Sequence, residues 1–207
     1  MLYSVRRAPP AAIAALAMMA LSGCSDGGPQ PTAGGAEAGC LTRAYEQIGG
    51  PISLVDHEGN AVTEAAFKGE PSLVFFGFTY CPDVCPMTLV TIDQALKALP
   101  EGTEPPRTIL VSIDPERDTP EALATYLSTD AFPDKITGLT GTPEQVRAAA
   151  DAFIADYSRI DQPESLGEYT MSHTDLVYFM DGNWEQKTFF PSTTPPDEMA
   201  RCLGEFL

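Results

Sequence analysis

The sequence predicts an α/β fold, with a central mixed sheet covered by helices on both faces and a hairpin extension at its N-terminal end. Strand-like apolar runs alternate with segments of helical periodicity, which indicates a mainly parallel sheet buried on both sides. Cys81 and Cys85 lie between the first long strand and the helix that follows it. A cysteine pair at that place in a chain of this order indicates the thioredoxin-like variety of α/β fold.

Apolar runs predict the strands. Residues 72–78 are continuously apolar and rich in aromatic side chains, as expected of a strand buried on both faces, and residues 108–113 repeat the pattern. Two short runs around a polar turn predict the hairpin, and Asp-Gly-Asn at 181–183 is a turn signal between two late strands. The predicted strands are residues 51–56, 61–63, 72–78, 108–113, 176–180 and 187–190.

Apolar spacing and start signals predict four helices. Residues 86–99 carry apolar side chains at helical spacing directly after the cysteines. Three later helices have a proline early in the first turn, where an N–H group has no intrahelical partner. Thr142 and Gln145 add a capping box to the second of these. The first-turn prolines are Pro120, Pro143 and Pro196.

The first residues resemble an export signal. Arg6 and Arg7 precede an apolar stretch at residues 11–21, which has the length of a signal-peptide core and is too short to span a bilayer. The tetrapeptide LSGC that ends at Cys24 resembles the bacterial lipobox, in which the cysteine becomes the lipidated first residue. The alternative is an uncleaved apolar anchor, and both place the remainder outside the cytoplasm.

These signals predict the domain organisation. Residues 1–23 are predicted to be a signal peptide, residues 24–39 a lipidated flexible tether of glycine, proline, alanine and small polar residues, and residues 40–207 one thioredoxin-like domain. The expected location is the bacterial cell envelope, where a membrane-anchored lipoprotein would face the periplasm.

Composition narrows the class of partner. The chain has 207 residues, of which 43% are hydrophobic and 20% charged, as in an ordinary globular domain. Its 12 Lys and Arg against 29 Asp and Glu give a formal net charge of −17. Nucleic acid is therefore not an expected partner, because binding it depends on cations that neutralise phosphates.

The cysteine pair predicts soft-metal or thiol chemistry. Pro86 fits a first helical turn, so Cys85 is expected at or beside the N-cap and Cys81 in the preceding loop, where the helix dipole and free amides favour thiolate. Thioredoxin-type redox pairs usually have two intervening residues, whereas here Pro82, Asp83 and Val84 intervene. The wider spacing allows both sulfurs to face one ion; the alternative is a permanent disulfide.

A third ligand is needed, and the chain has only two histidines. His57 lies in a polar turn and is expected to be merely exposed. His173 directly precedes a buried strand, a place that passes beside the cysteine loop in thioredoxin-like folds. The predicted ligand set is Cys81, Cys85 and His173.

Copper is the expected metal at this set. Two thiolates and one imidazole suit three-coordinate Cu(I), and Cu(II) if another donor joins, better than closed four-ligand zinc. Met87 and Met171 are near enough in sequence to add a thioether, although methionine is more often core filling.

Three segments closely resemble the Sco/SenC family of copper-binding cytochrome c oxidase assembly proteins: FGFTYCPDVCP, VSIDPERDTP and SHTDLVYFMD. The resemblance covers about residues 45–190. It implies a membrane-tethered thioredoxin-like domain that binds copper through two cysteines and a distant histidine, which match Cys81, Cys85 and His173. It also implies work on cytochrome c oxidase subunit II, either copper delivery to its dinuclear CuA centre or reduction of that centre's cysteines.

Other functions remain open at this point. The pair Cys81 and Cys85 could be redox-active without metal, as a membrane-tethered thiol-disulfide reductase, and in either role a periplasmic thiol reductant or copper donor would be a second partner. A thiol peroxidase is disfavoured, because a peroxidatic cysteine needs an arginine and a threonine around the peroxide and no cysteine ligand nearby.

Two cysteines near the domain ends and an acidic segment after a predicted strand are further candidates for structural or binding roles. Cys40 and Cys202 stand near the two ends of the domain, and domain ends often lie close together, so a structural disulfide is predicted between them. The acidic side chains Asp114, Glu116 and Asp118 could guide a partner. The favoured reading is structural: Pro115 fixes the strand exit, and Asp118 or Thr119 caps a helix.

Overall fold

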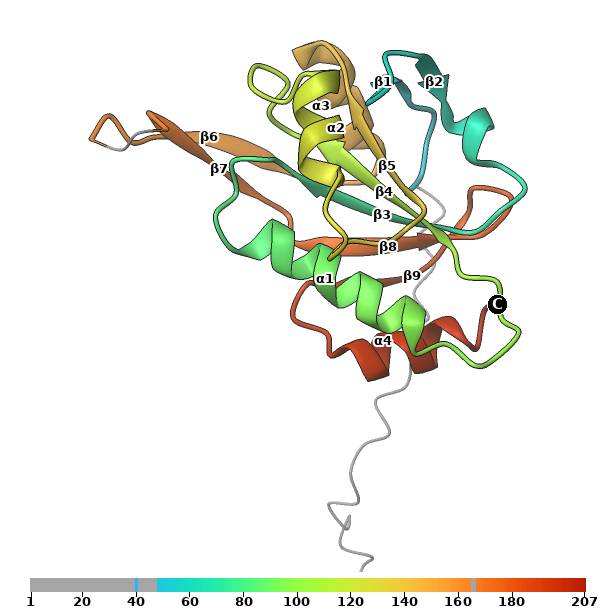
Figure 1. Ribbon diagram of the computed structural model, residues 1–207. Coiled ribbons are helices and arrows are strands. Elements are labelled where there is room, and N and C mark those ends of the chain that lie inside the picture. Colours follow the sequence, from blue (N-terminus) through green and yellow to red (C-terminus); the bar gives the residue numbers. More distant parts are fainter. Residues whose placement is uncertain (1–39, 41–47, 165–166) are drawn as a thin grey trace, which may run out of the picture. The chain divides into compact units, whose positions relative to one another are not determined.

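The computed structural model describes residues 40, 48–164 and 167–207, which lie within one compact unit, Glu37–Leu207 (Figure 1). The predicted signal peptide, Cys24 and the tether fall outside these residues. The strands are β1 (Ser53–Asp56), β2 (Ala61–Thr63), β3 (Ser72–Gly77), β4 (Arg107–Ser112), β5 (Ile136–Thr140), β6 (Tyr157–Asp161), β7 (Tyr169–His173), β8 (Leu176–Met180) and β9 (Gln186–Pro191). The helices are α1 (Val84–Lys97), α2 (Pro120–Leu127), α3 (Pro143–Ala152) and α4 (Pro196–Leu203), with a short 3-10 helix, η1 (Glu64–Phe67). Among the residues described, no helix is long and apolar enough to cross a membrane.

Seven strands form a mixed sheet in the order β2-β1-β5-β4-β3-β8-β9. β3, β4 and β5 are parallel, and the flanking pairs are antiparallel. The predicted mixed sheet and N-terminal hairpin are thus confirmed, and the hairpin β1–β2 joins the sheet beside β5. β6 and β7 pair only with each other, as a separate two-stranded sheet that extends from the main one in Figure 1.

Helices cover both faces of the sheet, as the sequence predicts. Side chains alternate between the faces along each strand. On one face, Gly77 of β3 lies against Cys85 of α1, Gly138 of β5 lies against α2, and α4 packs beside α1 (Figure 1). On the other face, Phe76 packs against Phe153 at the end of α3.

β3 is the central strand and leads directly to the cysteines. All of its residues are buried, which is why the sequence shows a continuous apolar run there. Phe75 and Phe76 have 0% and 1% of their surface exposed, and complete burial of such a side chain contributes about 1.5–3 kcal/mol. The start of the cysteine loop is therefore anchored in the most buried part of the domain.

The sequence missed three strands and placed one helix start too late. β5 carries Thr137, Gly138 and Thr140 and lacks an apolar run, because the glycine makes room for α2. β6 and β7 are largely exposed or half-buried, so no core selects an alternating pattern in them. α1 begins at Val84 and not at Pro86, because Asp83 occupies the N-cap.

A disulfide joins Cys40 to Cys202 on α4, with a sequence separation of 162 and a Cα–Cα distance of 5.3 Å. Cys202 is only 2% exposed. The bond ties the start of the described domain to its last helix.

Loss of this disulfide should destabilise the domain. The loop that it closes is long, and the chain-entropy model then gives about 4–5 kcal/mol, an upper figure. We expect the double variant Cys40→Ser/Cys202→Ala to lose about 2–4 kcal/mol of unfolding free energy in urea denaturation. As a control, reductant should not lower the stability of this variant further; an unchanged urea midpoint in the variant would contradict the prediction.

Candidate metal centre

Cys85 lies directly against the backbone of β3. A side chain on Gly77 would place its Cβ 3.1 Å from the Cys85 sulfur and 3.0 Å from the Phe75 ring, so glycine allows the sulfur and the ring to keep these positions without a shift. Cys85 is fully buried, with 0% exposure. The strand and the helix therefore fix one of the two sulfurs at the base of the site.

The first turn of α1 stabilises the other sulfur. The Cys85 amide donates a hydrogen bond to the Cys81 Sγ at 3.3 Å, which satisfies one of the free amides at the helix N-terminus. The hydrogen bond from the Cys85 thiol lowers the pKa of Cys81 to about 4, whereas the contact with Cys81 and burial raise the pKa of Cys85. The two thiols are therefore unequal: Cys81 is the thiolate and Cys85 the protonated partner.

This geometry corrects the predicted position of Cys85. It is the second residue of α1, beyond the N-cap Asp83, and not the cap itself. The helix N-terminus therefore favours thiolate at Cys81, because Cys81 in the loop accepts the amide while Cys85 is buried against β3.

His173 reaches the sulfurs from the end of β7. Its Nε2 lies 3.9 Å from the Cys85 Sγ, although the two residues are 88 positions apart. Its Nδ1 lies 2.9 Å from the Thr174 carbonyl oxygen, to which a protonated Nδ1 would donate, leaving the Nε2 lone pair directed at the sulfurs. The rings of Phe75 and Phe78 contact the imidazole edge-on, each with a centroid distance of 6.1 Å.

Burial and hydrogen bonding act in opposite directions on His173. Burial by itself lowers the pKa of the imidazole, but hydrogen bonds to Cys81 and to the Thr174 carbonyl outweigh it and raise that pKa. A metal ion would compete with a proton for Nε2.

The spacing of sulfur and imidazole fits a shared ion. A thiolate and an imidazole that bind one ion at about 2.3 and 2.0 Å, as around zinc, are about 3.5–3.7 Å apart at tetrahedral or trigonal angles. The observed separation of 3.9 Å is only slightly longer. Within the part of the chain that the structure describes, however, no three such side chains already stand at full coordinating spacing, so three-ligand binding needs a small shift of the loop or the ring.

The two methionines near the site residues in sequence and the second histidine have surroundings of their own. Met87 is 57% exposed on α1, and Met171 is half-buried in a pocket beside β7. His57 is half-exposed, and its Nδ1 accepts a hydrogen bond from the Gly138 amide at 3.0 Å, so it links the hairpin turn to β5.

The acidic residues after β4 are mainly structural, which is the favoured reading from the sequence. Asp118 is completely buried, and its carboxylate accepts hydrogen bonds from the Thr79 amide at 3.1 Å and from the hydroxyls of Thr79 and Ser112, each at 2.6 Å. Burial raises the pKa of Asp118. Thr119, and not Asp118, caps α2 by accepting from the Ala122 amide. Asp118 therefore fixes the chain just before Cys81.

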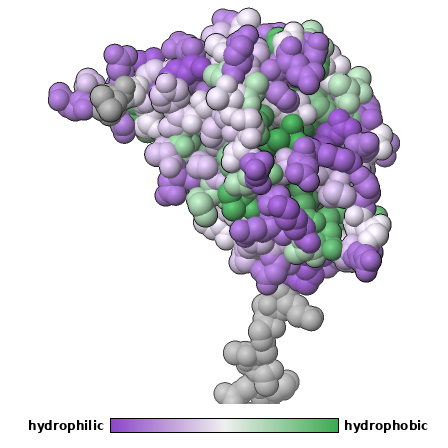
Figure 2. Space-filling view, viewed as in Figure 1, coloured by the Kyte–Doolittle hydropathy of each residue, from purple (hydrophilic) through white to green (hydrophobic). Residues whose placement is uncertain are grey.

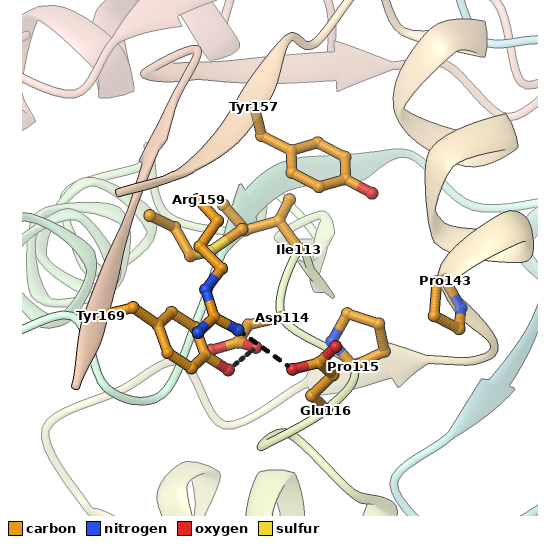
Figure 3. Close-up of a pocket in the computed structure, with 9 residues that line it drawn as sticks. Ile113, Asp114, Pro115, Glu116, Pro143, Tyr157, Arg159 and Tyr169 are labelled. Carbon is orange, nitrogen blue, oxygen red and sulfur yellow. Dashed lines mark hydrogen bonds and ion pairs between the residues drawn. The ribbon is translucent and has the colours of Figure 1, made fainter. Parts of the chain in front are cut away.

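Sequence reasoning did not single out Arg117 and Tyr169, although Arg117 lies within the DPERDTP motif. Asp114, 3% exposed, pairs with Arg117 and accepts from the Tyr169 hydroxyl at 2.8 Å. In Figure 3 the Tyr169 hydroxyl points at Asp114, and Arg159 of β6 reaches Glu116, its ion-pair partner at 3.5 Å. Asp114, Glu116, Arg159 and Tyr169 help to line a pocket of about 140 Å³ beside β7.

The fold and this thiol–imidazole centre define a thioredoxin-like protein with two unequal cysteines and a distant histidine. The SCO1/SenC family profile matches residues 42–207, and the chain belongs to that family. Protein SenC of Rhodobacter capsulatus is 37% identical over 166 residues, 79% of this chain and 72% of that protein. The human mitochondrial SCO1 homolog is 37% identical over 159 residues, 76% of this chain and 52% of the human protein.

A solved structure agrees with these relatives. The structure of Bradyrhizobium japonicum ScoI with copper bound has a TM-score of 0.68 and 38% sequence identity. The match covers 77% of this chain and 99% of the ScoI chain.

The lowered pKa of Cys81 predicts its reactivity. The thiolate is the nucleophile. With a pKa of about 4, Cys81 stays ionised from neutral pH down to about pH 5, and the thiolate is lost as the pH falls through 4. In the reduced protein, iodoacetamide should alkylate Cys81 first, with little change in rate between about pH 8 and pH 5. Peptide mass spectrometry measures the site and the rate.

The Cys85→Ala variant is the matched control. It removes the hydrogen bond that lowers the Cys81 pKa, so the alkylation midpoint should move to higher pH. A midpoint in the wild-type protein near that of an ordinary thiol, about 8.5, would show that Cys81 is not the stabilised thiolate.

Proposed function

We propose that this protein is a copper metallochaperone for assembly of the CuA centre of cytochrome c oxidase. Copper would be held by Cys81, Cys85 and His173 and passed to subunit II of the oxidase. The observation that carries the proposal is the convergence of the His173 imidazole on the cysteine pair from a strand far away in sequence. A purely structural cysteine pair would not require an imidazole directed at its sulfurs.

The relatives support copper as the cargo. The Bradyrhizobium japonicum ScoI structure, 38% identical to this chain, contains bound copper, and so does a structure of yeast Sco1 with 29% identity. The Sco family is described as one of cytochrome c oxidase assembly proteins. Thiolates and imidazole are soft and borderline donors that suit Cu(I), and a further donor would be needed for Cu(II).

The unequal thiols suit a cargo site that must also release its ion. Cys81 is partly exposed, whereas Cys85 is buried against β3. A target thiolate can approach the ion from the Cys81 side and replace the ligands one after another, without opening the core. Once empty, the two thiols can form a disulfide with loss of two protons and two electrons to an oxidant, so reloading requires a thiol reductant in the same compartment.

The same asymmetry supports a second candidate, a thiol-disulfide reductase that keeps the CuA cysteines of the oxidase reduced. A low-pKa, partly exposed cysteine beside a buried resolving thiol is the usual arrangement for disulfide exchange. A thiol peroxidase is less well supported. A peroxidatic cysteine needs a threonine at the peroxide, but the hydroxyl of Thr79, close to Cys81 in sequence, donates its hydrogen bond to Asp118.

The proposed location follows from the sequence alone. Residues 1–23 would direct export, and lipidation of Cys24 would hold the domain at a membrane, facing the periplasm, through the tether at residues 24–39. Such an anchor would keep the domain close to a membrane-bound oxidase.

Copper binding by single-residue variants tests the chaperone role. We expect the reduced domain to bind one equivalent of Cu(I), with X-ray absorption showing two sulfur donors and one nitrogen donor. His173→Ala should lose the nitrogen signal and weaken Cu(I) binding by about tenfold to hundredfold in chelator competition, and either cysteine variant should weaken it more. His57→Ala is the matched control, since it removes the other histidine and should leave the donor set unchanged. Unaltered X-ray absorption in His173→Ala would exclude the proposed ligand set.

Disulfide reduction separates the two candidate functions. If the reductase role is the principal one, His173→Ala should retain most of the rate at which the reduced domain reduces a disulfide of a subunit II CuA fragment. The sulfurs carry out that exchange, and the Cys85 hydrogen bond contributes more than His173 to the lowered pKa of Cys81. If copper delivery is principal, the same variant should fail to load copper into the reduced fragment. Both reactions can be followed on one fragment, by thiol counting and by the absorption spectrum of CuA.

A further inference from the structure

His173 lies on a hairpin that the main sheet does not hold. β6 and β7 pair with each other, and neither pairs with a strand of the seven-stranded sheet (Figure 1). Backbone hydrogen bonds of the main sheet therefore do not run along the hairpin. The end of β7 is tied to that sheet by the chain itself, because β8 begins three residues after His173, at Leu176. The direction of the hairpin beyond that point depends on its contacts with the rest of the domain.

Arg117, in the segment after β4, makes such contacts with the backbone of the hairpin. Its Nη1 donates to the carbonyl oxygens of Gly167 at 3.2 Å and Tyr169 at 3.1 Å, at the start of β7. The opposite edge of the guanidinium pairs with the buried Asp114, whose other oxygen accepts from the Tyr169 hydroxyl. The Arg117 side chain is only 15% exposed, so solvent screens these interactions weakly.

The same guanidinium also links the hairpin to the cysteine loop. Its carbon lies 3.7 Å from the centre of the Tyr169 ring and 4.6 Å from the centre of the Tyr80 ring, and Tyr80 directly precedes Cys81. Cation–π contacts of partly desolvated guanidinium groups are attractive, so both stacking contacts favour this placement of Arg117. Arg117 thus touches both segments that supply ligands, the loop before Cys81 and the strand that ends at His173.

We propose that Arg117 is a positioning residue that holds the His173 hairpin over the cysteine pair, a role that rests on the copper function proposed above. β7 runs from Tyr169 to His173, so a contact at its start fixes the ring at its end across about 13 Å of extended strand. Rotation of the hairpin about this contact would move the Nε2 away from the sulfurs. Asp114 supports the role by fixing Arg117, and neither residue contacts the ion.

A second arginine shows why loss of Arg117 should loosen the hairpin without unfolding it. Arg147 of α3 donates to the Tyr157 carbonyl at 3.1 Å, and Tyr157 lies opposite His173 in the hairpin register. This contact is more exposed: the Arg147 side chain is 42% exposed and its ion-pair partner Asp156 is 96% exposed. Both arginines thus contact backbone carbonyls of the hairpin, and Arg117 is the more buried of the two, while the chain itself joins the hairpin to α3 and β8.

The first experiment needs no copper. Arg117→Ala should speed amide hydrogen exchange of β6 and β7 in the apo protein by about tenfold or more, while β3 and β4 keep their protection. Arg159→Ala is the matched control: it also removes a guanidinium stacked on Tyr169, at 3.8 Å, but Arg159 belongs to β6 itself and its ion pairs are with the exposed Glu116 and Asp161. It should leave the exchange of β7 close to that of the parent protein.

The second experiment is a double-mutant cycle on Cu(I) affinity, measured by chelator competition in the reduced protein. Arg117→Ala should weaken Cu(I) binding by about tenfold to hundredfold and reduce the nitrogen signal in X-ray absorption. Arg117→Ala/His173→Ala should bind no more weakly than His173→Ala, because the arginine acts only through the imidazole. Arg117→Lys, which keeps the charge but loses the planar fork, should show the same changes at smaller size and serves if the alanine variant does not fold.

The outcomes separate this proposal from the proposed function. If His173→Ala weakens copper binding and Arg117→Ala stays within about threefold of the parent protein, the positioning role is wrong and the ligand set stands. Additive losses in the double variant would also overturn it, since they would mean that Arg117 acts on the sulfurs. If His173→Ala binds copper as the parent does, the ligand set is wrong, and hydrogen exchange of β7 alone then decides whether Arg117 holds the hairpin.

Discussion

The site depends on one packing constraint, the direct contact of the Cys85 sulfur with the backbone of β3. Glycine at residue 77 favours this contact, because a Cβ there would lie 3.1 Å from that sulfur and would press against it. The contact buries Cys85 completely and leaves Cys81 in the loop as the acceptor of the helix amide. The pKa values of the two thiols are unequal mainly because Cys85 donates a hydrogen bond to Cys81, and the burial of Cys85 adds to the difference. The position of the ion proposed here, between a fixed sulfur and the ring of His173, also follows from this contact.

Two buried carboxylates hold the remaining parts of the site in place, in a chain whose acidic excess would otherwise oppose their burial. Asp118 accepts hydrogen bonds from Thr79 and Ser112, so it joins the ends of β3 and β4 just before Cys81. Asp114 pairs with Arg117 and with the Tyr169 hydroxyl, so it joins the end of β4 to the hairpin. Removing either carboxylate would leave buried donors unpaired, which costs about 1–3 kcal/mol for each group. Both carboxylates therefore have a structural role. Of the three acidic residues considered as contacts for a partner, Glu116 is the one whose side chain stays accessible.

The parts of the fold that the core determines were predictable from the sequence, and the parts that it does not determine were not. The burial of β3 on both faces produces a continuous apolar run in the sequence, and the capping box expected at Thr142 is present. The hairpin β6–β7 has no buried face to enforce alternation, so nothing in its sequence distinguishes it from a loop. The sequence indicated His173 as a candidate by its place before β8, but gave no sign of what sets the direction of a hairpin that does not pair with the main sheet. That information lies in contacts between Arg117 and backbone carbonyls, and such contacts leave no periodic trace in a sequence.

The geometry also bears on whether copper delivery and thiol reduction are separate functions. Both proposed reactions begin at Cys81, because it is the ionised and more accessible sulfur. Disulfide exchange then needs Cys85 to follow as the resolving thiol, and its high pKa keeps it protonated until Cys81 has reacted. Copper binding instead needs Cys85 to lose its proton when the ion arrives, which the charge of the ion promotes. His173 would act as a ligand in the second reaction alone, although its hydrogen bond to Cys81 also helps to lower the pKa of that thiol. Its position relative to the sulfurs would therefore decide how strongly the proposed site favours copper over simple thiol chemistry. In the proposed function, the hairpin is the element that adds a metal ligand to a thioredoxin-like thiol pair, and the buried contacts of the hairpin would support that site.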